Sequence, residues 1–168
     1  MALDPRNPSS ASPLFLREAE IRRGIELLFF GHAELMRSGD SILKTHDLGR
    51  AHHRALYFIA RKPGLTIGEL MKLLSVTKQS LGRVLSELEE RGLIAREQGQ
   101  RDRRQILIRL TDDGEALETE LYAAFREKMV EAYGAAGPGA VGGFWDVLEM
   151  LLPTDARQRA AALTRANR

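Results

Sequence analysis

Residues 66–114 of this 168-residue chain decide its fold, and they read TIGELMKLLSVTKQSLGRVLSELEERGLIAREQGQRDRRQILIRLTDDG. Thr66, with Glu69 three residues later, has the pattern of a capping box, which predicts a short helix directly after Thr66. A tight turn follows, and Thr77 is expected to cap a second helix. Two short helices joined by a tight turn are typical of a helix-turn-helix unit.

The second predicted helix has one apolar face, because Leu81, Leu85 and Leu88 recur at helical spacing. Gly92 is expected to end it, since glycine adopts the left-handed conformation that often follows a helix. Short apolar runs then flank a polar tip at residues 99–103, which predicts a β-hairpin. The predicted fold is therefore mainly α with a small β-hairpin wing, a winged helix-turn-helix.

The rest of the chain divides around this centre. We expect a disordered tail at 1–13, a helix and linker at 14–46, the winged helix-turn-helix domain at 47–111, and helices with a tail at 112–168. The expected helices outside the central stretch span 13–37, 47–61, 112–133 and 144–152, with an Ala/Arg-rich end that could form a frayed helix. Phe29 and Phe30 widen the apolar surface of the first helix, which is typical of a subunit contact.

Charge is distributed unevenly along the chain. Residues 47–111 hold 13 Lys or Arg against 7 Asp or Glu, whereas residues 112–168 hold 6 against 10. A basic centre suits contact with phosphate, although an ordinary solvated surface gives the same counts.

The outward residues at the start of the second helix favour DNA recognition. Gln79 and Arg83 are the expected base-reading side chains, with Ser80 as a further candidate, because Gln can pair with adenine and Arg with guanine. Thr77 and Lys78 are expected to hold phosphate at the positive helix N-terminus. The same residue types also occur on any solvated helix.

The hairpin strengthens this interpretation, because it concentrates arginine at its tip. Arg101, Arg103 and Arg104 lie there, flanking or following the single acidic residue Asp102. Arginine on a projecting tip suits the negative potential of a narrow minor groove.

Three motifs at fixed spacing make the sequence similar to the MarR family of bacterial regulators. They are Gly92-Leu93-Ile94, the wing run Asp102-Arg103-Arg104, and Leu110-Thr111-Asp112-Asp113-Gly114. The resemblance covers about residues 20–152, with its specific motifs within residues 66–114.

The resemblance implies a homodimer with N- and C-terminal dimerisation helices, whose interface is made by the N-terminal helix within 14–46 and the last two helices within 112–168. It implies that residues 47–111 are the DNA-binding domain and that the dimer binds a pseudo-palindromic operator in double-stranded DNA. It implies that Arg104 enters the minor groove and that Asp102 holds the wing arginines. It also implies a repressor, sometimes an activator, released by a small ligand or by oxidation. The chain has no cysteine, so the cysteine route of oxidation is closed.

A ligand pocket between the dimerisation helices and the DNA-binding lobe is a further expectation. Phe29, His32, Tyr57 and Tyr122 could line it, and the resemblance implies small aromatic acids as occupants; ordinary core packing is the alternative. The adjacent His52 and His53 raise a metal-sensor hypothesis, but neighbouring helical residues point about 100° apart. We expect no metal and no cofactor.

The remaining features exclude several classes. We find no apolar run long enough for a membrane span, no signal-peptide core, and no catalytic or phosphate-loop motif. The expectation is a cytoplasmic protein that is not an enzyme. A winged helix that binds proteins remains the other alternative, since the same scaffold serves both roles.

Overall fold

The computed structural model describes residues 13–99 and 104–165, which form two units, one ending at Leu35 and the other beginning at Met36. The first unit holds a 3-10 helix, Pro13–Leu16, and most of α1, Glu18–Arg37. The sequence predicted one continuous helix here. A tight 3-10 turn precedes the α-helix instead, which is common at helix ends. The predicted disordered tail lies outside the described residues, except for Pro13.

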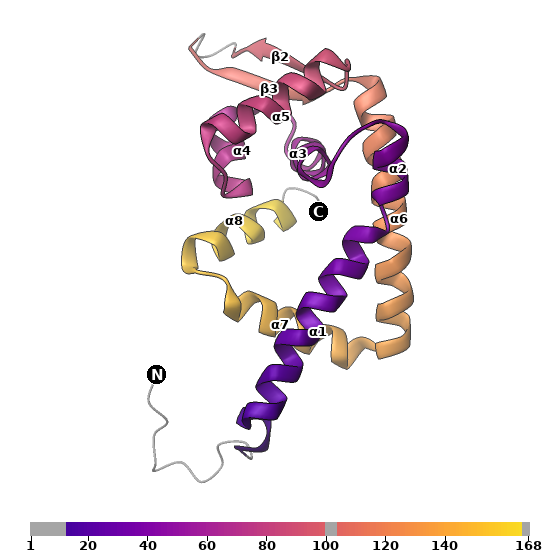
Figure 1. The fold of residues 1–168 in the computed structure, drawn as a ribbon. Helices are drawn as coiled ribbons and strands as arrows, with labels where there is room; N and C mark the ends of the chain where they lie inside the picture. Colours follow the sequence, from indigo (N-terminus) through magenta and orange to yellow (C-terminus); the bar gives the residue numbers. More distant parts are fainter. Residues whose placement is uncertain (1–12, 100–103, 166–168) are drawn as a thin grey trace. The chain divides into compact units, whose positions relative to one another are not determined.

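The second unit contains the predicted winged helix-turn-helix (Figure 1). Its elements are α2 (Asp40–Thr45), α3 (Arg50–Arg61), β1 (Leu65–Thr66), α4 (Ile67–Leu74), α5 (Lys78–Glu90), β2 (Ile94–Gln98), β3 (Ile106–Leu110), α6 (Asp112–Ala136), α7 (Pro138–Leu151) and α8 (Thr154–Arg165). The strands form an antiparallel sheet in the order β1-β3-β2, with Arg96 opposite Ile108. The fold is mainly α with a small hairpin wing, as predicted.

One hydrophobic core joins α3, α4, α5 and the sheet. Leu56 and Ile59 of α3, Leu70 of α4, Leu88 of α5 and Ile108 of β3 are at most 1% exposed. Burying a side chain of this size contributes about 1.5–3 kcal/mol. The helix that presents the polar face of the motif is therefore fixed from behind by its apolar side.

The predicted start of the α3 helix was wrong by three residues. Asp47 has a positive φ of 51° and Gly49 is extended, so the helix begins at Arg50. Two short elements, α2 and β1, were not predicted. Their six and two residues are too few for periodicity to reveal.

The predicted start of the last apolar helix was also wrong. The helix α7 begins at Pro138, six residues before Phe144, and continues through Gly142 and Gly143. Proline suits the first position of a helix, and each interior glycine costs only about 1 kcal/mol. The Ala/Arg-rich end forms α8, and Figure 1 shows it returning toward α3.

Among the described residues, no helix combines the length and the low polarity that crossing a bilayer would require.

Candidate nucleic-acid interface

The start of α4 is fixed by the predicted capping box. The Thr66 hydroxyl accepts the Glu69 N–H at 3.2 Å, and the Glu69 carboxylate accepts the Thr66 N–H at 2.7 Å. Lys62 donates to the same carboxylate at 2.5 Å. The Lys62 ammonium and the Thr66 N–H together hold the pKa of Glu69 below its ordinary value, so the cap stays ionised.

The turn between α4 and α5 is held from α3. Ser75 takes the left-handed conformation, with φ 55°, at the end of α4. The Arg54 guanidinium donates to the carbonyl oxygen of Leu74 at 3.1 Å, which satisfies one of the last acceptors of α4. Arg54 therefore positions the turn that feeds α5.

Thr77 caps α5 as predicted, since its hydroxyl accepts the Ser80 N–H at 3.3 Å. The five residues around the start of α5 that were predicted to contact DNA are all exposed: Thr77, Lys78, Gln79, Ser80 and Arg83. Neither Lys78 nor Arg83 forms an ion pair with any residue that the structure describes. The outer face at the start of α5 thus presents donors and two cations to solvent.

Gly82 also lies on this outer face. A methyl group added there would meet nothing within 4 Å, so packing within the chain does not require glycine. The sequence interpretation, that glycine permits close approach of a DNA backbone, stays a prediction.

A histidine joins α5 to the beginning of α3. The Nδ1 atom of His52 accepts the Gly49 N–H at 3.0 Å, so the ring carries its proton on Nε2. Nε2 then donates to the Glu87 carboxylate of α5 at 2.7 Å. His52 therefore fixes the roll of α5, a role that sequence analysis missed because the partners are 35 residues apart.

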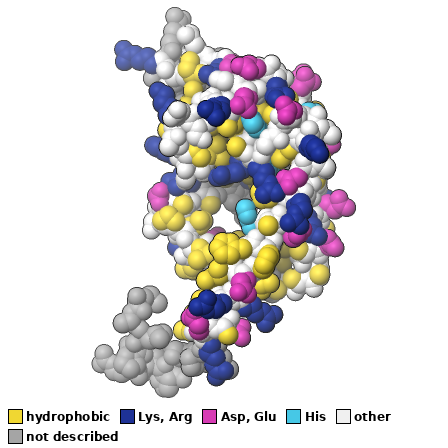
Figure 2. Space-filling model, viewed as in Figure 1, with side chains coloured by type: hydrophobic (Ala, Val, Ile, Leu, Met, Phe, Trp, Pro, Cys, Tyr) yellow, Lys and Arg dark blue, Asp and Glu magenta, His cyan; other side chains and the backbone are white. Residues whose placement is uncertain are grey.

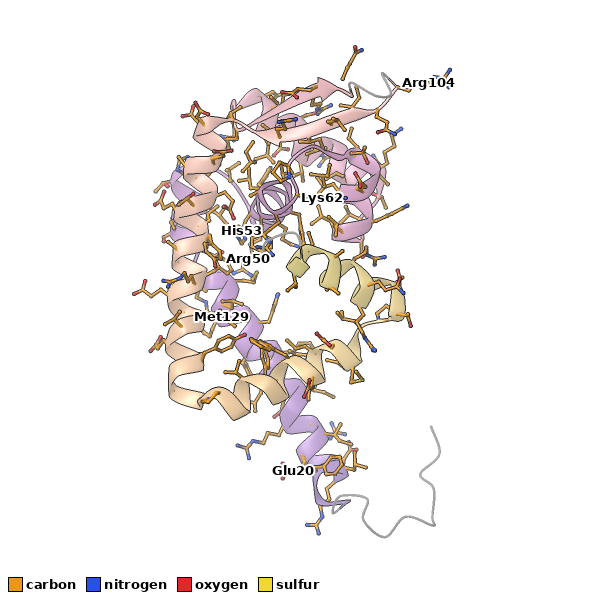
Figure 3. The ribbon with its side chains drawn as sticks, turned by 180° about the vertical axis from the view of Figure 1, so that it is seen from behind. Glu20, Arg50, His53, Lys62, Arg104 and Met129 are labelled. Carbon is orange, nitrogen blue, oxygen red and sulfur yellow. The ribbon has the colours of Figure 1, made fainter. Side chains whose placement is uncertain are left out.

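The arginines of the hairpin fall into two groups. Arg96 pairs with Glu89 at 3.1 Å, and Arg109 pairs with Glu97 at 3.1 Å, so these two stabilise the wing and its contact with α5. Arg104 is exposed and lies at the tip of the wing, where Figure 3 labels it. Arg101, Asp102 and Arg103, which were also predicted to contact DNA, lie outside the described residues.

The residues Thr111 to Gly114, at the start of α6, connect that helix to the segment that ends α5. The Thr111 hydroxyl donates to the Gly92 carbonyl oxygen at 2.6 Å and accepts the Gly114 N–H at 3.1 Å. A Cβ at Gly114 would lie 2.0 Å from the Leu93 carbonyl oxygen. Glycine at position 114 is therefore required for this close approach.

The four residues predicted to bind a ligand lie on three helices. Phe29 and His32 are exposed on α1, Tyr57 is half-buried on α3, and Tyr122 is 49% exposed on α6. None of them lines the cavity of about 370 Å³ found between the end of α3, β3 and the start of α6. Ligand binding by these residues stays a prediction.

His53 points away from His52, as their adjacency on a helix predicted. It is 7% exposed, its ring centre lies 4.5 Å from that of Phe125, and burial lowers its pKa. Figure 3 shows it between α3 and α6. Within the described ranges, no three His, Asp or Glu side chains are grouped as they would be around a metal ion.

The terminal helices expose many large apolar side chains. On α1 these include Ile25, Leu28, Phe29 and Phe30, and on α7 they include Phe144, Trp145, Val147, Met150 and Leu151. Neither helix has a buried residue among those described, and Figure 2 shows hydrophobic side chains crowded over α1. Surfaces of this kind usually mark an interface.

Comparison with known proteins identifies the family. A family model described as MarR matches residues 46–105. The chain is 48% identical to the HTH-type transcriptional regulator PetP of Rhodobacter capsulatus over 149 residues, which span 89% of this chain and 90% of PetP.

Solved structures agree. The reduced form of MarR from E. coli is 25% identical, with a TM-score of 0.61, and the match covers 76% of this chain and 95% of that one. A mutant E. coli MarR in complex with operator DNA is 26% identical, with a TM-score of 0.65 and coverage of 84% and 100%. These relatives are regulators and not enzymes, as sequence analysis expected. The chain belongs to the MarR family of transcriptional regulators.

Proposed function

We propose that the chain is a homodimeric regulator that binds a pseudo-palindromic operator, with α5 in the major groove and the wing at the minor groove. One observation carries the proposal: the exposed start of α5 and Arg104 of the wing lie on the same side of the domain (Figures 1 and 3). Lys78, Gln79 and Arg83 belong to the first surface and Arg104 to the second. The complex of mutant E. coli MarR with operator DNA supports this use of the fold.

Within this interface, each residue has a proposed role. Gln79 and Arg83 read bases, with Ser80 beside them, because their side chains are exposed on the outer face of α5. Thr77 and Lys78 hold phosphate, since the first amides of a helix lack partners within the helix. Arg104, with Arg101 and Arg103 of the wing run, contacts the minor groove, and Asp102 orients these arginines.

Substitution tests these roles directly. A duplex is first selected from a random-sequence pool by binding to the wild-type protein, and affinities are then measured by fluorescence anisotropy. Gln79→Ala and Arg83→Ala should each cost about 1–3 kcal/mol and relax base preference at the position read. Arg104→Ala should weaken binding with little change in base preference.

Arg126→Ala is the matched control, because Arg126 is exposed on α6, away from α5 and the wing. It should bind the selected duplex as the wild type does. Unchanged affinity in all three interface variants would contradict the DNA-contact roles proposed for Gln79, Arg83 and Arg104.

We also propose that dimerisation uses the apolar surfaces of α1 and α7, and that binding represses transcription by occupying the promoter. A small aromatic ligand in contact with Tyr57 and Tyr122 would release the protein from DNA. Benzoate is a simple probe: it should raise the melting temperature of the wild type and do so less for Tyr57→Ala. No shift in the wild type with benzoate or substituted benzoates would contradict the ligand proposal.

A further inference from the structure

The last helix, α8, is attached to the molecule by polar contacts. None of its described residues is buried, so α8 contributes no side chain to the hydrophobic core. It follows α7 after Pro153 and returns to the end of α3 (Figure 1). Hydrogen bonds near its two ends connect it to α7 and to α3.

The first attachment joins α8 to α7. Arg157, in the first turns of α8, donates to the Glu149 carbonyl oxygen at 3.0 Å and to the Leu152 carbonyl oxygen at 3.2 Å. The last carbonyl groups of a helix lack partners within the helix and carry its negative dipole end. An arginine is therefore well matched to the end of α7.

The second attachment joins α8 to the DNA-binding lobe, which we define as α3, α4, α5 and the sheet. Arg61, the last residue of α3, donates to the Leu163 carbonyl oxygen at 3.1 Å in a partly buried position. Arg61 also lies near Glu118 of α6. Burial raises the pKa of Glu118, and the positive charge of Arg61 partly opposes that rise. Arg61 thus lies where α3, α6 and α8 meet.

We propose that α8 is a strap, pinned to α7 by Arg157 and to the DNA-binding lobe by Arg61, which restricts the movement of the lobe relative to α7. The inference rests on the proposed function in one respect, namely that this lobe carries the helix that reads DNA. Arg61 is then a positioning residue, since it acts through α3 on α5, which we call the recognition helix.

The strap has a consequence for operator binding. Hydrogen bonds of this kind contribute little individually, and α8 adds no buried side chain, so α8 can detach while the core stays folded. A DNA-binding lobe that cannot move relative to α7 loses less conformational entropy when it binds its half-site of an operator with two half-sites at fixed spacing. The strapped protein should therefore bind two half-sites more tightly and discriminate their spacing better than the unstrapped protein.

A distance measurement tests the strap without DNA. The chain has no cysteine, so Ser86→Cys on α5 and Asp146→Cys on α7 can carry a single pair of nitroxide labels. Diluting the labelled chain with unlabelled chain leaves only the distance within one molecule, whatever the oligomeric state. Pulsed electron paramagnetic resonance should give a narrow distance distribution for the wild type, and a broad one for Arg61→Met and for deletion of residues 154–168.

Two further variants complete the test. Arg159→Met is the matched control, because Arg159 pairs with Asp155 inside α8 at 2.6 Å and should leave the distribution narrow. Arg61→Lys keeps the positive charge and should give a distance distribution narrower than that of Arg61→Met but broader than that of the wild type. Unchanged widths in Arg61→Met and in the deletion would overturn the proposal. Broadening in Arg61→Met without broadening in the deletion would also overturn it, because Arg61 would then act through Glu118 and not through α8.

Operator binding provides the functional readout. On the duplex selected with the wild type, the deletion should bind about tenfold more weakly, while affinity for a single half-site stays the same. The wild type should lose affinity when one base pair is inserted between half-sites, and the deletion should lose less. Because the distance measurement contains no DNA, failure of the strap and failure of DNA binding give separate results.

Discussion

At the scale of the residue, close approaches decide what each position tolerates. Gly114 packs against the carbonyl of Leu93, and the Thr111 N–H donates to the same oxygen at 3.1 Å. This oxygen belongs to the residue that follows the left-handed Gly92 at the end of α5. A change at Gly114 therefore reaches the recognition helix through two hydrogen-bonded residues.

Gly114→Ala should lower the free energy of unfolding by about 3 kcal/mol or more, because its Cβ would overlap a backbone oxygen. Urea denaturation measures the change. Gly134→Ala is the control on the same helix, since a Cβ there meets nothing within 4 Å and alanine favours a helix interior. Equal stability in the two variants would contradict this packing.

His53 should make stability depend on pH. Burial lowers its pKa from the ordinary 6.5, so below pH 6.5 the unfolded chain binds a proton that the folded chain does not. The stabilisation is complete above pH 6.5 and is lost as the pH falls toward the lowered value. His53→Phe keeps the ring contact with Phe125 and should flatten this loss in urea unfolding between pH 7 and 5. An identical slope in the wild type and the variant would contradict it.

At the scale of the element, local sequence signals predicted the helix-turn-helix well. The caps Thr66 and Thr77 and the end at Gly92 depend on residues within four positions, and the structure confirms all three. The two-residue strand β1 depends on pairing with Ile108, which is far along the chain, so no local pattern could reveal it.

The same reason limited prediction of the site. The exposed face of α5 followed from its apolar periodicity, and the structure confirms that exposure. His52 and Arg54 hold α5 and its turn, but their partners are 35 and 20 residues away. Contacts between residues so far apart in the sequence come from tertiary packing, and neither composition nor periodicity predicts them.

Gly82→Ala separates the stability of α5 from its function. Alanine should stabilise the helix by up to about 1 kcal/mol, because nothing in the chain lies near the added methyl group. It should also weaken binding to the selected duplex if DNA backbone approaches there. Melting and anisotropy measure the two effects, and Gly134→Ala should show only the first. A stabilised variant with full affinity would contradict close approach at Gly82.

At the scale of the whole molecule, the proposed function requires two copies of the chain. Val147 and Met150 of α7 are 62% and 67% exposed, which is unusual for apolar residues unless another chain covers them. Val147→Glu combined with Met150→Glu should give a folded monomer in analytical ultracentrifugation. Lys72→Glu, at an exposed position of α4, should leave a dimer. A wild type that sediments as a monomer would contradict the proposed assembly.

Hydroxyl-radical footprinting on the selected duplex records where each copy of the chain touches DNA. Two recognition helices related by a two-fold axis should protect two symmetric segments about one helical turn apart, with added minor-groove protection beside each from the wing. Arg104→Ala should remove the minor-groove protection and leave the rest. A single unsymmetrical protected segment, or protection that is the same on any sequence, would contradict the account.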